Sequence, residues 1–452
     1  MVGFAGKNAV VVGAGASGLA AAELLVREGA RVVLNDGRTR EALGEAAARA
    51  EATGAELAFG GHDLAVFDGA DLVVVSPGVP PLAVLDEVAA RGVEVIGELE
   101  LAARHVAGTL IAVTGTNGKS TVTTLIGEMM RRTGRPTFVG GNLGVPLSAA
   151  VGTPAAAPGG ALVVEVSSFQ LERVRRFAPD VAVLLNVTPD HLDRYPNFEA
   201  YARAKGHVFA PRSAAVIPAG DPLCARLAAR AKEVHRFGAP DGEVRSEDGE
   251  LRDLVTGLSL PRSELPLFGR HNEDNACAAI LAARLAGVDE TSIVGALREA
   301  KGLAHRAVLV RELDGVAYVD DSKATNVGAT VAALDGLASP ERRVVLIAGG
   351  VDKGGSYAPI AERLREVGRA VVLIGQAAPL IEAALAGLTL PIERASSMED
   401  AVRRARSLAR PGDLVLLAPA CSSFDMFTSY AHRGDAFAEA VRALSPEEPR
   451  WA

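Results

Sequence analysis

The stretch that decides the fold is LIAVTGTNGKST, residues 110–121. Its apolar first half is typical of a buried strand, and its second half is a glycine-bracketed turn that ends in GKST. Backbone N–H groups of such a turn bind an anion, the lysine supplies a mobile positive charge, and a hydroxyl can hold Mg²⁺. The full GxxxxGK[ST] pattern would place its first glycine at Val113, and Gly115 serves instead. The turn could be an ordinary strand-to-helix connection, but its residues favour a binding site for a nucleoside triphosphate.

Residue usage singles out lysine and asparagine. Lys and Arg total 47, but the lysines are only those at positions 7, 119, 205, 232, 301, 323 and 353. Because arginine serves here wherever any cation suffices, a retained lysine is a candidate for a compact charge or a reactive amine. Asparagine shows a similar bias, since most of its positions fall in polar clusters, at 117, 142, 186, 272, 275 and 326.

Length and composition exclude several classes of protein. A chain of 452 residues predicts about two to four domains. Three cysteines cannot form a disulfide framework, which favours a reducing compartment. The net charge of −8, with no basic run, argues against nucleic acid as a partner. No charged leader and no apolar stretch of roughly 18 residues is present, so we expect a cytoplasmic protein with no membrane partner.

The first hundred residues alternate strand-like and helix-like segments. Between the first strand and helix lies GAGASG, residues 13–18, and Asp36 ends the second strand. This matches the dinucleotide fingerprint, in which glycines let the backbone approach a pyrophosphate and the acid takes a hydroxyl. Alone the match is weak, because such a turn also arises from packing or binds other phosphates. A third strand, at 72–76, ends in another turn suited to a ligand.

Two further buried-strand patterns in the central region, at 161–166 and 181–187, end in polar groups. The carboxyl ends of parallel strands line one edge of a sheet, so Lys119, Glu165 and His191 should converge. Glu165 and His191 would suit Mg²⁺ or Mn²⁺ beside a triphosphate. Alternatively, Glu165 is a buried carboxylate paired with an arginine, His191 is structural, and Lys205 is a helical surface lysine. We also expect a tight loop at 140–144, a hairpin turn at 248–249 and a helix at 269–286.

The last third restarts the strand-and-helix alternation near residue 302, with strands expected at 317–320, 344–348, 370–374 and 413–418. Polar turns follow three of these strands, at 320–326, 349–355 and 419–424. A solvated turn does not explain the lysine, threonine and two acids of the first of them. These turns predict a second convergent edge, suited to a small anionic substrate.

Taken together, these segments resemble the Mur ligases, the ATP-dependent amino-acid ligases of peptidoglycan precursor synthesis, from residue 13 to residue 434. The discriminating motifs are VTGTNGKST (113–121), NVTPDHLDRY (186–195), GRHNEDN (269–275), HR (305–306), DSKATN (321–326), PACSSFDMF (419–427) and HRG (432–434). DSKATN is similar to the turn of the D-glutamate-adding members, whereas members that add diaminopimelate or a dipeptide have a turn resembling Asp-Tyr-Ala-His.

The resemblance implies an α/β protein of three domains that acts as a monomer. Residues 1–98 would form a Rossmann-like UDP-substrate-binding domain, 99–303 a central P-loop-type mononucleotide-binding ATPase domain, and 304–452 a Rossmann-like amino-acid-binding domain. The implied small-molecule partners are UDP-MurNAc-L-alanine and D-glutamate, and the implied cofactors are ATP and two Mg²⁺. The acceptor carboxylate would attack the γ-phosphate to give an acyl phosphate, which the amine of D-glutamate would then open.

The resemblance also implies residue roles. The acceptor nucleotide would be bound by Ser17, Asp36, Arg38, Gly78, Asn142 and His191. ATP would be bound by Gly115, Thr116, Asn117, Gly118, Lys119, Ser120, Thr121, Asn275, Arg306, Asp321 and Lys323. Ser120 with Glu165 would hold one Mg²⁺, and His191 with Lys205, carbamylated by CO₂, the other. The catalytic residues would be Lys119, Glu165, His191 and Lys205. D-Glutamate would be bound by Thr325, Lys353, Ser423, Phe424 and Tyr430, of which positions 424 and 430 vary in the family.

Two other classes remain open on the residues alone. A dinucleotide-dependent oxidoreductase would use the first turn but leave the phosphate turn idle. A nucleotide-binding regulator without ligase activity would not need the second substrate edge. Folylpolyglutamate-type ligases share the central motifs but lack a nucleotide-fold domain before them.

Overall fold

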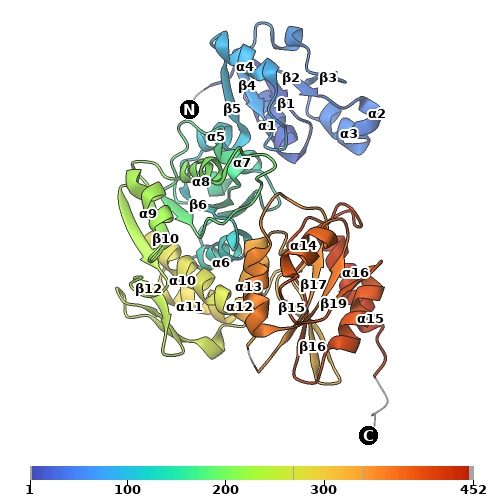
Figure 1. Ribbon diagram of the computed structural model, residues 1–452. Coiled ribbons are helices and arrows are strands. Elements are labelled where there is room, and N and C mark those ends of the chain that lie inside the picture. Colours follow the sequence, from blue (N-terminus) through green and yellow to red (C-terminus); the bar gives the residue numbers. More distant parts are fainter. Residues whose placement is uncertain (1–2, 268, 340, 447–452) are drawn as a thin grey trace, which may run out of the picture.

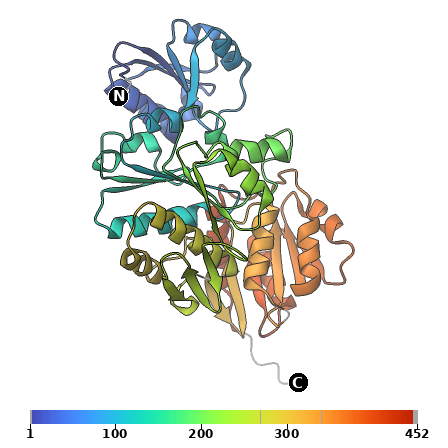
Figure 2. The same ribbon diagram turned by 90° about the vertical axis from the view of Figure 1, so that its left-hand side faces the viewer.

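The computed structural model describes residues 3–267, 269–339 and 341–446. These residues form three α/β units, each built around its own sheet. The N-terminal unit sits on one end of the central unit, and the C-terminal unit lies beside the opposite end (Figures 1 and 2). The α/β fold with three parallel-dominated sheets confirms the predicted fold class.

The N-terminal sheet is wholly parallel, in the order β3-β2-β1-β4-β5. Its three inner strands are the three that the sequence predicts, whereas the two short edge strands were not predicted. The elements are β1 (Asn8–Val12), α1 (Ala16–Arg27), β2 (Arg31–Asp36), α2 (Arg40–Leu43), α3 (Glu45–Ala52), β3 (Glu56–Phe59), β4 (Leu72–Val75), α4 (Ala83–Ala90), β5 (Glu94–Gly97) and α5 (Glu98–Ala103).

The central sheet has the order β14-β13-β12-β11-β10-β9-β6-β8-β7 and is parallel from β7 to β12. Its strands and longer helices are β6 (Thr109–Thr114), α6 (Lys119–Arg132), β7 (Thr137–Gly141), β8 (Ala161–Glu165), α7 (Ser168–Leu171), β9 (Val181–Leu184), α8 (Phe198–Gly206), β10 (Ala214–Pro218), α9 (Pro222–Leu227), β11 (Glu233–Phe237), β12 (Val244–Glu247), β13 (Glu250–Asp253), β14 (Ser259–Pro261), α10 (Arg270–Leu285) and α11 (Glu290–Arg298). The hairpin turn predicted at 248–249 joins β12 to β13. The tight loop predicted at 140–144 is partly wrong, because Gly140 and Gly141 complete β7.

The C-terminal sheet has the order β15-β16-β20-β17-β18-β19, and only its β15–β16 pair is antiparallel. All four strands expected in this region are present, and the edge strands β15 and β19 were not predicted. The elements are β15 (Val308–Leu313), β16 (Val316–Asp320), α12 (Val327–Leu337), β17 (Val344–Gly349), α13 (Ala358–Val367), β18 (Gly368–Ile374), α14 (Ala378–Leu385), β19 (Ile392–Arg394), α15 (Met398–Leu408), β20 (Leu414–Leu417) and α16 (Tyr430–Arg442).

The N-terminal and central units share an apolar core, whereas the C-terminal unit has cores of its own. One continuous cluster of buried side chains runs from the N-terminal sheet into the central one, through residues such as Leu24 on α1, Leu99 on α5 and Leu147. The C-terminal sheet instead has two clusters of its own, one on each face. Between the central and C-terminal units, α12 lies against α10 (Figure 1). None of the helices formed by the described residues is long and apolar enough to cross a membrane.

Candidate active site

The turn between β6 and α6 has the geometry of an anion-binding loop. Gly118 has φ 85°, and a Cβ built there would lie 2.4 Å from Asn275 Oδ1, so only glycine fits. Lys119 begins α6, and its Nζ donates to the carbonyl oxygens of Gly115, at 3.0 Å, and Thr116, at 2.8 Å. The ammonium group therefore folds over its own turn, where a phosphate group would bind.

A carboxylate and a hydroxyl meet beside this turn. Ser120 Oγ donates to Glu165 Oε2 at 2.6 Å, and Asn142 Nδ2 donates to Glu165 Oε1 at 2.6 Å. Arg306 Nη2, from the C-terminal unit, donates to the same serine hydroxyl at 2.9 Å. Ser120 and Asn142, from separate elements, thus contact buried Glu165 directly, and Arg306 reaches the same serine.

The side chains around Glu165 could supply some of the ligands of a Mg²⁺ ion, with substrate oxygens supplying the rest. They are too few to bind the ion by themselves. Among the residues that the structure describes, no group of three or more His, Cys, Asp and Glu side chains could hold a metal ion. Mg²⁺ is usually bound through one or two carboxylates together with phosphate oxygens and water. One buried carboxylate and one hydroxyl beside a phosphate turn match that pattern.

Lys205 is a core residue rather than the surface lysine of the alternative reading. It lies on α8 with only 2% of its surface exposed, and its Nζ donates to the Gly115 carbonyl oxygen at 2.8 Å. Lys119 donates to the same oxygen. Burial, together with the nearby charge of Lys119, lowers the pKa of Lys205 well below its ordinary value. The amine of Lys205 is therefore suited to the uncharged form.

The segment after β9 links the central and C-terminal units. Asp190 Oδ1 accepts a hydrogen bond from Lys353 Nζ at 3.3 Å, and Asp190 Oδ2 accepts one from Asn326 Nδ2 at 3.0 Å. The neighbouring His191 has φ 55°, and its ring packs against Phe169 with centroids 4.9 Å apart. Burial lowers the pKa of His191, which favours the neutral imidazole that metals bind. Phosphate-edge and substrate-edge residues therefore meet at Asp190.

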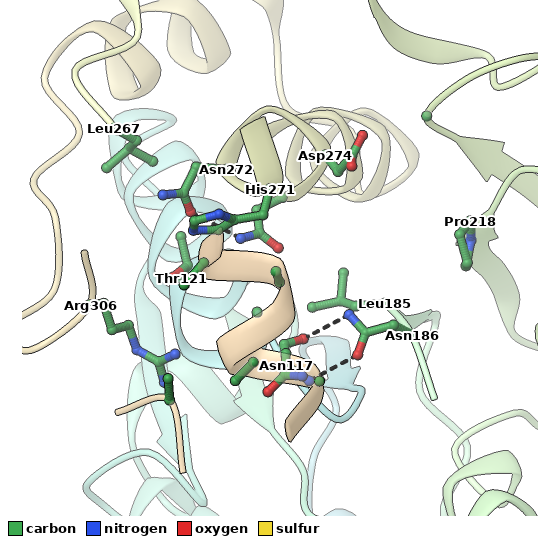
Figure 3. A pocket seen from close by; sticks show the side chains of 18 of the residues that line it. Asn117, Thr121, Leu185, Asn186, Pro218, Leu267, His271, Asn272, Asp274 and Arg306 are labelled. Carbon is green, nitrogen blue, oxygen red and sulfur yellow. Dashed lines mark hydrogen bonds between the residues drawn. The ribbon is translucent and has the colours of Figure 1, made fainter. Parts of the chain in front are cut away.

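A cavity of about 420 Å³ opens from the phosphate turn toward the C-terminal unit (Figure 3). Seven predicted ATP residues line it: Asn117, Gly118, Thr121, Asn275, Arg306, Asp321 and Lys323. The other predicted ATP residues form the turn or its first helical residues. Asn117 and Asn186 exchange two hydrogen bonds at the mouth of the turn, drawn as dashed lines in Figure 3.

The charged groups of this cavity are strongly perturbed. Burial raises the pKa of Asp321 to about 7, although Arg306 acts to lower it. Burial and then Arg306 lower the pKa of Lys323 to about 8. Lys323 Nζ lies 3.7 Å from the centroid of the Tyr430 ring. Arg306 and Lys323, two cations held in one buried space, favour an anionic ligand.

A second cavity, of about 510 Å³, lies in the N-terminal unit. It is lined by Ser17, Asp36, Arg38 and Gly78, four of the residues predicted to bind the acceptor nucleotide, whereas Asn142, a fifth, lies at Glu165. The Asp36 carboxylate is already engaged, because it accepts from Ala14 N at 2.8 Å and forms an ion pair with Arg38 at 2.9 Å. Although burial acts to raise it, these partners lower the pKa of Asp36 to about 2.

The residues predicted to bind D-glutamate do not form one closed pocket. Lys353 lines a small cavity with Asp190 and Tyr357. Ser423 is buried, but the Phe424 side chain is 75% exposed. Tyr430 begins α16 and packs against Lys323, a residue predicted to bind ATP. The assignments of Phe424 and Tyr430 stay predictions, and they have the weakest geometric support.

Comparison with known proteins decides the family. The Mur ligase MurD-like N-terminal domain matches residues 7–97, the Mur ligase middle domain residues 113–283, and the Mur ligase, glutamate ligase domain residues 305–421. A protein of Anaeromyxobacter dehalogenans named UDP-N-acetylmuramoylalanine--D-glutamate ligase is 48% identical over 98% of both chains. The chain belongs to the Mur ligase family.

Solved structures agree with this Mur ligase at the level of the fold. A pseudomurein peptide ligase type C from Methanothermus fervidus has a TM-score of 0.64 at 19% identity and covers 97% of this chain and 100% of its own. The MurF ligase from Thermotoga maritima, in complex with ADP, has a TM-score of 0.60 at 19% identity, with 91% and 94% coverage. As a family member, this ligase is an ATP-dependent enzyme that forms amide bonds.

The sequence analysis predicted no role for several residues that line the cavities of this Mur ligase. Asn186, His271 and Asn272 line the nucleotide cavity, and so does one face of α12. The scarcity of asparagine signalled two of these residues and Asn326, but it assigned no role to any of them. Asp190 was quoted within a motif, yet its contacts cross a domain junction that no sequence pattern shows.

Proposed function

We propose that this ligase joins D-glutamate to UDP-N-acetylmuramoyl-L-alanine in peptidoglycan precursor synthesis, with ATP converted to ADP and phosphate. The observation that carries the proposal is the shared nucleotide cavity, in which the phosphate turn meets Arg306, Asp321 and Lys323 of the C-terminal unit. A site completed by two domains can hold ATP between an acceptor on one side and an amino acid on the other. The relatives named for this reaction match over nearly the whole chain.

In the proposed reaction, an oxygen of the acceptor's alanine carboxylate attacks the γ-phosphorus and the bond to ADP breaks. Lys119 and Arg306 are placed to neutralise charge on the transferring phosphoryl group. The amine of D-glutamate then attacks the acyl carbon, and phosphate leaves from the tetrahedral intermediate. Closure of the two domains around the cavity would exclude water, which would otherwise hydrolyse the acyl phosphate.

The proposed metal sites use the same residues. Glu165 and Ser120 would hold one Mg²⁺. His191 with Lys205 would hold the second, once the uncharged Lys205 amine has formed a carbamate with CO₂. Bound Mg²⁺ would stabilise the negative charge on the phosphoryl group during its transfer.

We further propose domain boundaries after residues 98 and 303, and a monomer as the active unit. The monomer is what the family resemblance implies, and residues of this chain line both cavities. The NAD-dependent alternative has no support from the comparisons.

The deciding experiment measures phosphate release from ATP with UDP-MurNAc-L-alanine and one amino acid at a time. We expect release with D-glutamate and none above background with L-lysine or diaminopimelate, because the Lys353 ammonium group, already paired with Asp190, would repel a distal ammonium group. Preference for a diamino acid, or turnover that needs no UDP-linked acceptor, would contradict the proposal.

A further inference from the structure

Asn326 occupies a junction between three functional elements. It is the residue before α12, and its Oδ1 accepts the hydrogen bond from Ala329 N at 2.8 Å that caps this helix. Only 7% of its surface is exposed. Thr325, directly before it, belongs to the turn expected to receive the amino acid. The position therefore connects that turn to α12, which lines the nucleotide cavity.

The amide of Asn326 also reaches across to the central unit. Its Nδ2 donates to Asp190 Oδ2 at 3.0 Å and to Asn117 Oδ1 at 3.3 Å. Asn117 lies in the phosphate turn and exchanges two hydrogen bonds with Asn186 at the end of the neighbouring strand segment. One side chain of the C-terminal unit thus contacts both polar edges of the central unit.

Asparagine suits this position better than the other residues that cap helices. Serine, threonine and aspartate can accept the capping hydrogen bond, but a deprotonated aspartate has no hydrogen to donate. Here the same amide must accept from Ala329 and donate to a carboxylate. The buried Asp190 carboxylate would otherwise keep only Lys353 as its partner from the C-terminal unit.

Close packing supports the same junction. A Cβ on Gly328, in the first turn of α12, would lie 2.6 Å from Thr188 Oγ1 and 3.5 Å from Asn117 Nδ2. The start of α12 therefore presses against the segment after β9 at a distance that only glycine permits. The hydrogen bonds of Asn326 and the packing at Gly328 act on the same surface.

We propose that Asn326 is a positioning residue that clasps the C-terminal unit onto the phosphate edge. Its amide holds the start of α12 against Asn117 and Asp190, which fixes both the wall of the nucleotide cavity and the turn containing Thr325. The clasp rests on the proposed function only for the identity of the amino acid. Its effect on domain arrangement is independent of any substrate.

The first test replaces Asn326 with aspartate, which keeps the cap and the shape but loses both donated hydrogen bonds and puts a second carboxylate against Asp190. We expect an unchanged unfolding temperature and a larger radius of gyration in ligand-free small-angle scattering. In turnover, the KM for D-glutamate should rise about tenfold or more, while the KM for the UDP-linked acceptor stays within about twofold. The matched control is Asn197→Asp, the same change at the cap of α8, where the side chain is exposed.

A second variant tests the clasp by shape alone. Gly328→Ala should expand the molecule in scattering without lowering the unfolding temperature, because alanine favours a helix but its Cβ collides with Thr188. Gly387→Ala is its control, since a Cβ there meets nothing within 4 Å. If Asn326→Asp keeps the wild-type radius of gyration and the wild-type KM for D-glutamate, the clasp is wrong. If Asn326→Asp expands the molecule but the wild-type protein shows no turnover with D-glutamate, only the proposed substrate is overturned.

Discussion

The N-terminal turn at residues 13–18 and the central turn at 115–120 look alike in sequence but differ in how their cavities are closed. All residues that line the first cavity come from the N-terminal unit, between Gly13 and Pro80. The second cavity takes its walls from both the central and the C-terminal units. A turn closed by its own domain can hold a ligand, whereas a turn completed by another domain can couple binding to a reaction.

The two turns also differ in the charged side chains around them. In the first, Asp36 and Arg38 neutralise each other, and no buried lysine accompanies them in the described lining. At the second, Lys119 and Lys205 donate to one carbonyl oxygen, and Arg306 arrives from the next unit. The positive charges of Lys119 and Arg306 would stabilise phosphoryl transfer, so substitutions at the second turn should impair turnover and those at the first should impair only binding.

The largest effect is expected for Lys119→Ala. Removing a charge aimed at the transferring phosphoryl group should lower kcat at least ~100-fold, with UDP binding unchanged. Steady-state turnover and calorimetry with UDP measure the two quantities. Lys232→Ala, at an exposed lysine, is the control. Near-normal turnover of a folded Lys119→Ala protein would remove the central turn from catalysis.

Substitutions at Lys205 test whether this residue acts as a reactive amine or only as a positive charge. Lys205→Arg puts a fixed positive charge at this position and cannot form the proposed carbamate, so activity should fall about 100-fold. Lys205→Ala should regain part of its activity when short carboxylates are added, because they can take the place of the carbamate. An arginine variant that keeps most of its activity would contradict carbamylation.

Lys353 tests the edge opposite the central turn. Lys353→Ala should raise the KM for D-glutamate about 30-fold, because a carboxylate would lose its ammonium partner, and should change the KM for ATP much less. Initial rates with each substrate varied in turn provide the comparison. The opposite result, weaker ATP binding with D-glutamate unaffected, would place Lys353 on the nucleotide side.

The smallest effect is expected at the N-terminal turn. Arg38→Ala removes an exposed guanidinium from the cavity wall and should raise the KM for the UDP-linked acceptor about tenfold, with kcat unchanged. Calorimetry should show that UDP binds the wild type and that NAD does not. A fall in kcat would show that the two turns are not as distinct as their cavities suggest.

Patterns within single strands and turns were predictable from the sequence. The buried runs before Gly115, Glu165 and Asp190 are continuous apolar segments, because helices or other layers cover both faces of their sheet. Short edge strands such as β15 escaped prediction, since its Arg311 and Glu312 break the apolar run. Contacts between units were also out of reach, because neither the Asn326–Asp190 hydrogen bond nor the wall formed by α12 leaves a periodic signal.

The apolar cluster shared by the N-terminal and central units holds these two units at a fixed distance from each other. Leu24, Leu99 and Leu147 belong to one packed core, so the span from the cavity at Arg38 to the phosphate turn is set by rigid packing. An acceptor anchored by its nucleotide can present its carboxylate to Lys119 only if the connecting sugar has the matching length. If the acceptor nucleotide binds at Arg38 as proposed, we expect acceptor length to be selected by the distance between these two anchoring points, independently of the groups that contact the sugar between them.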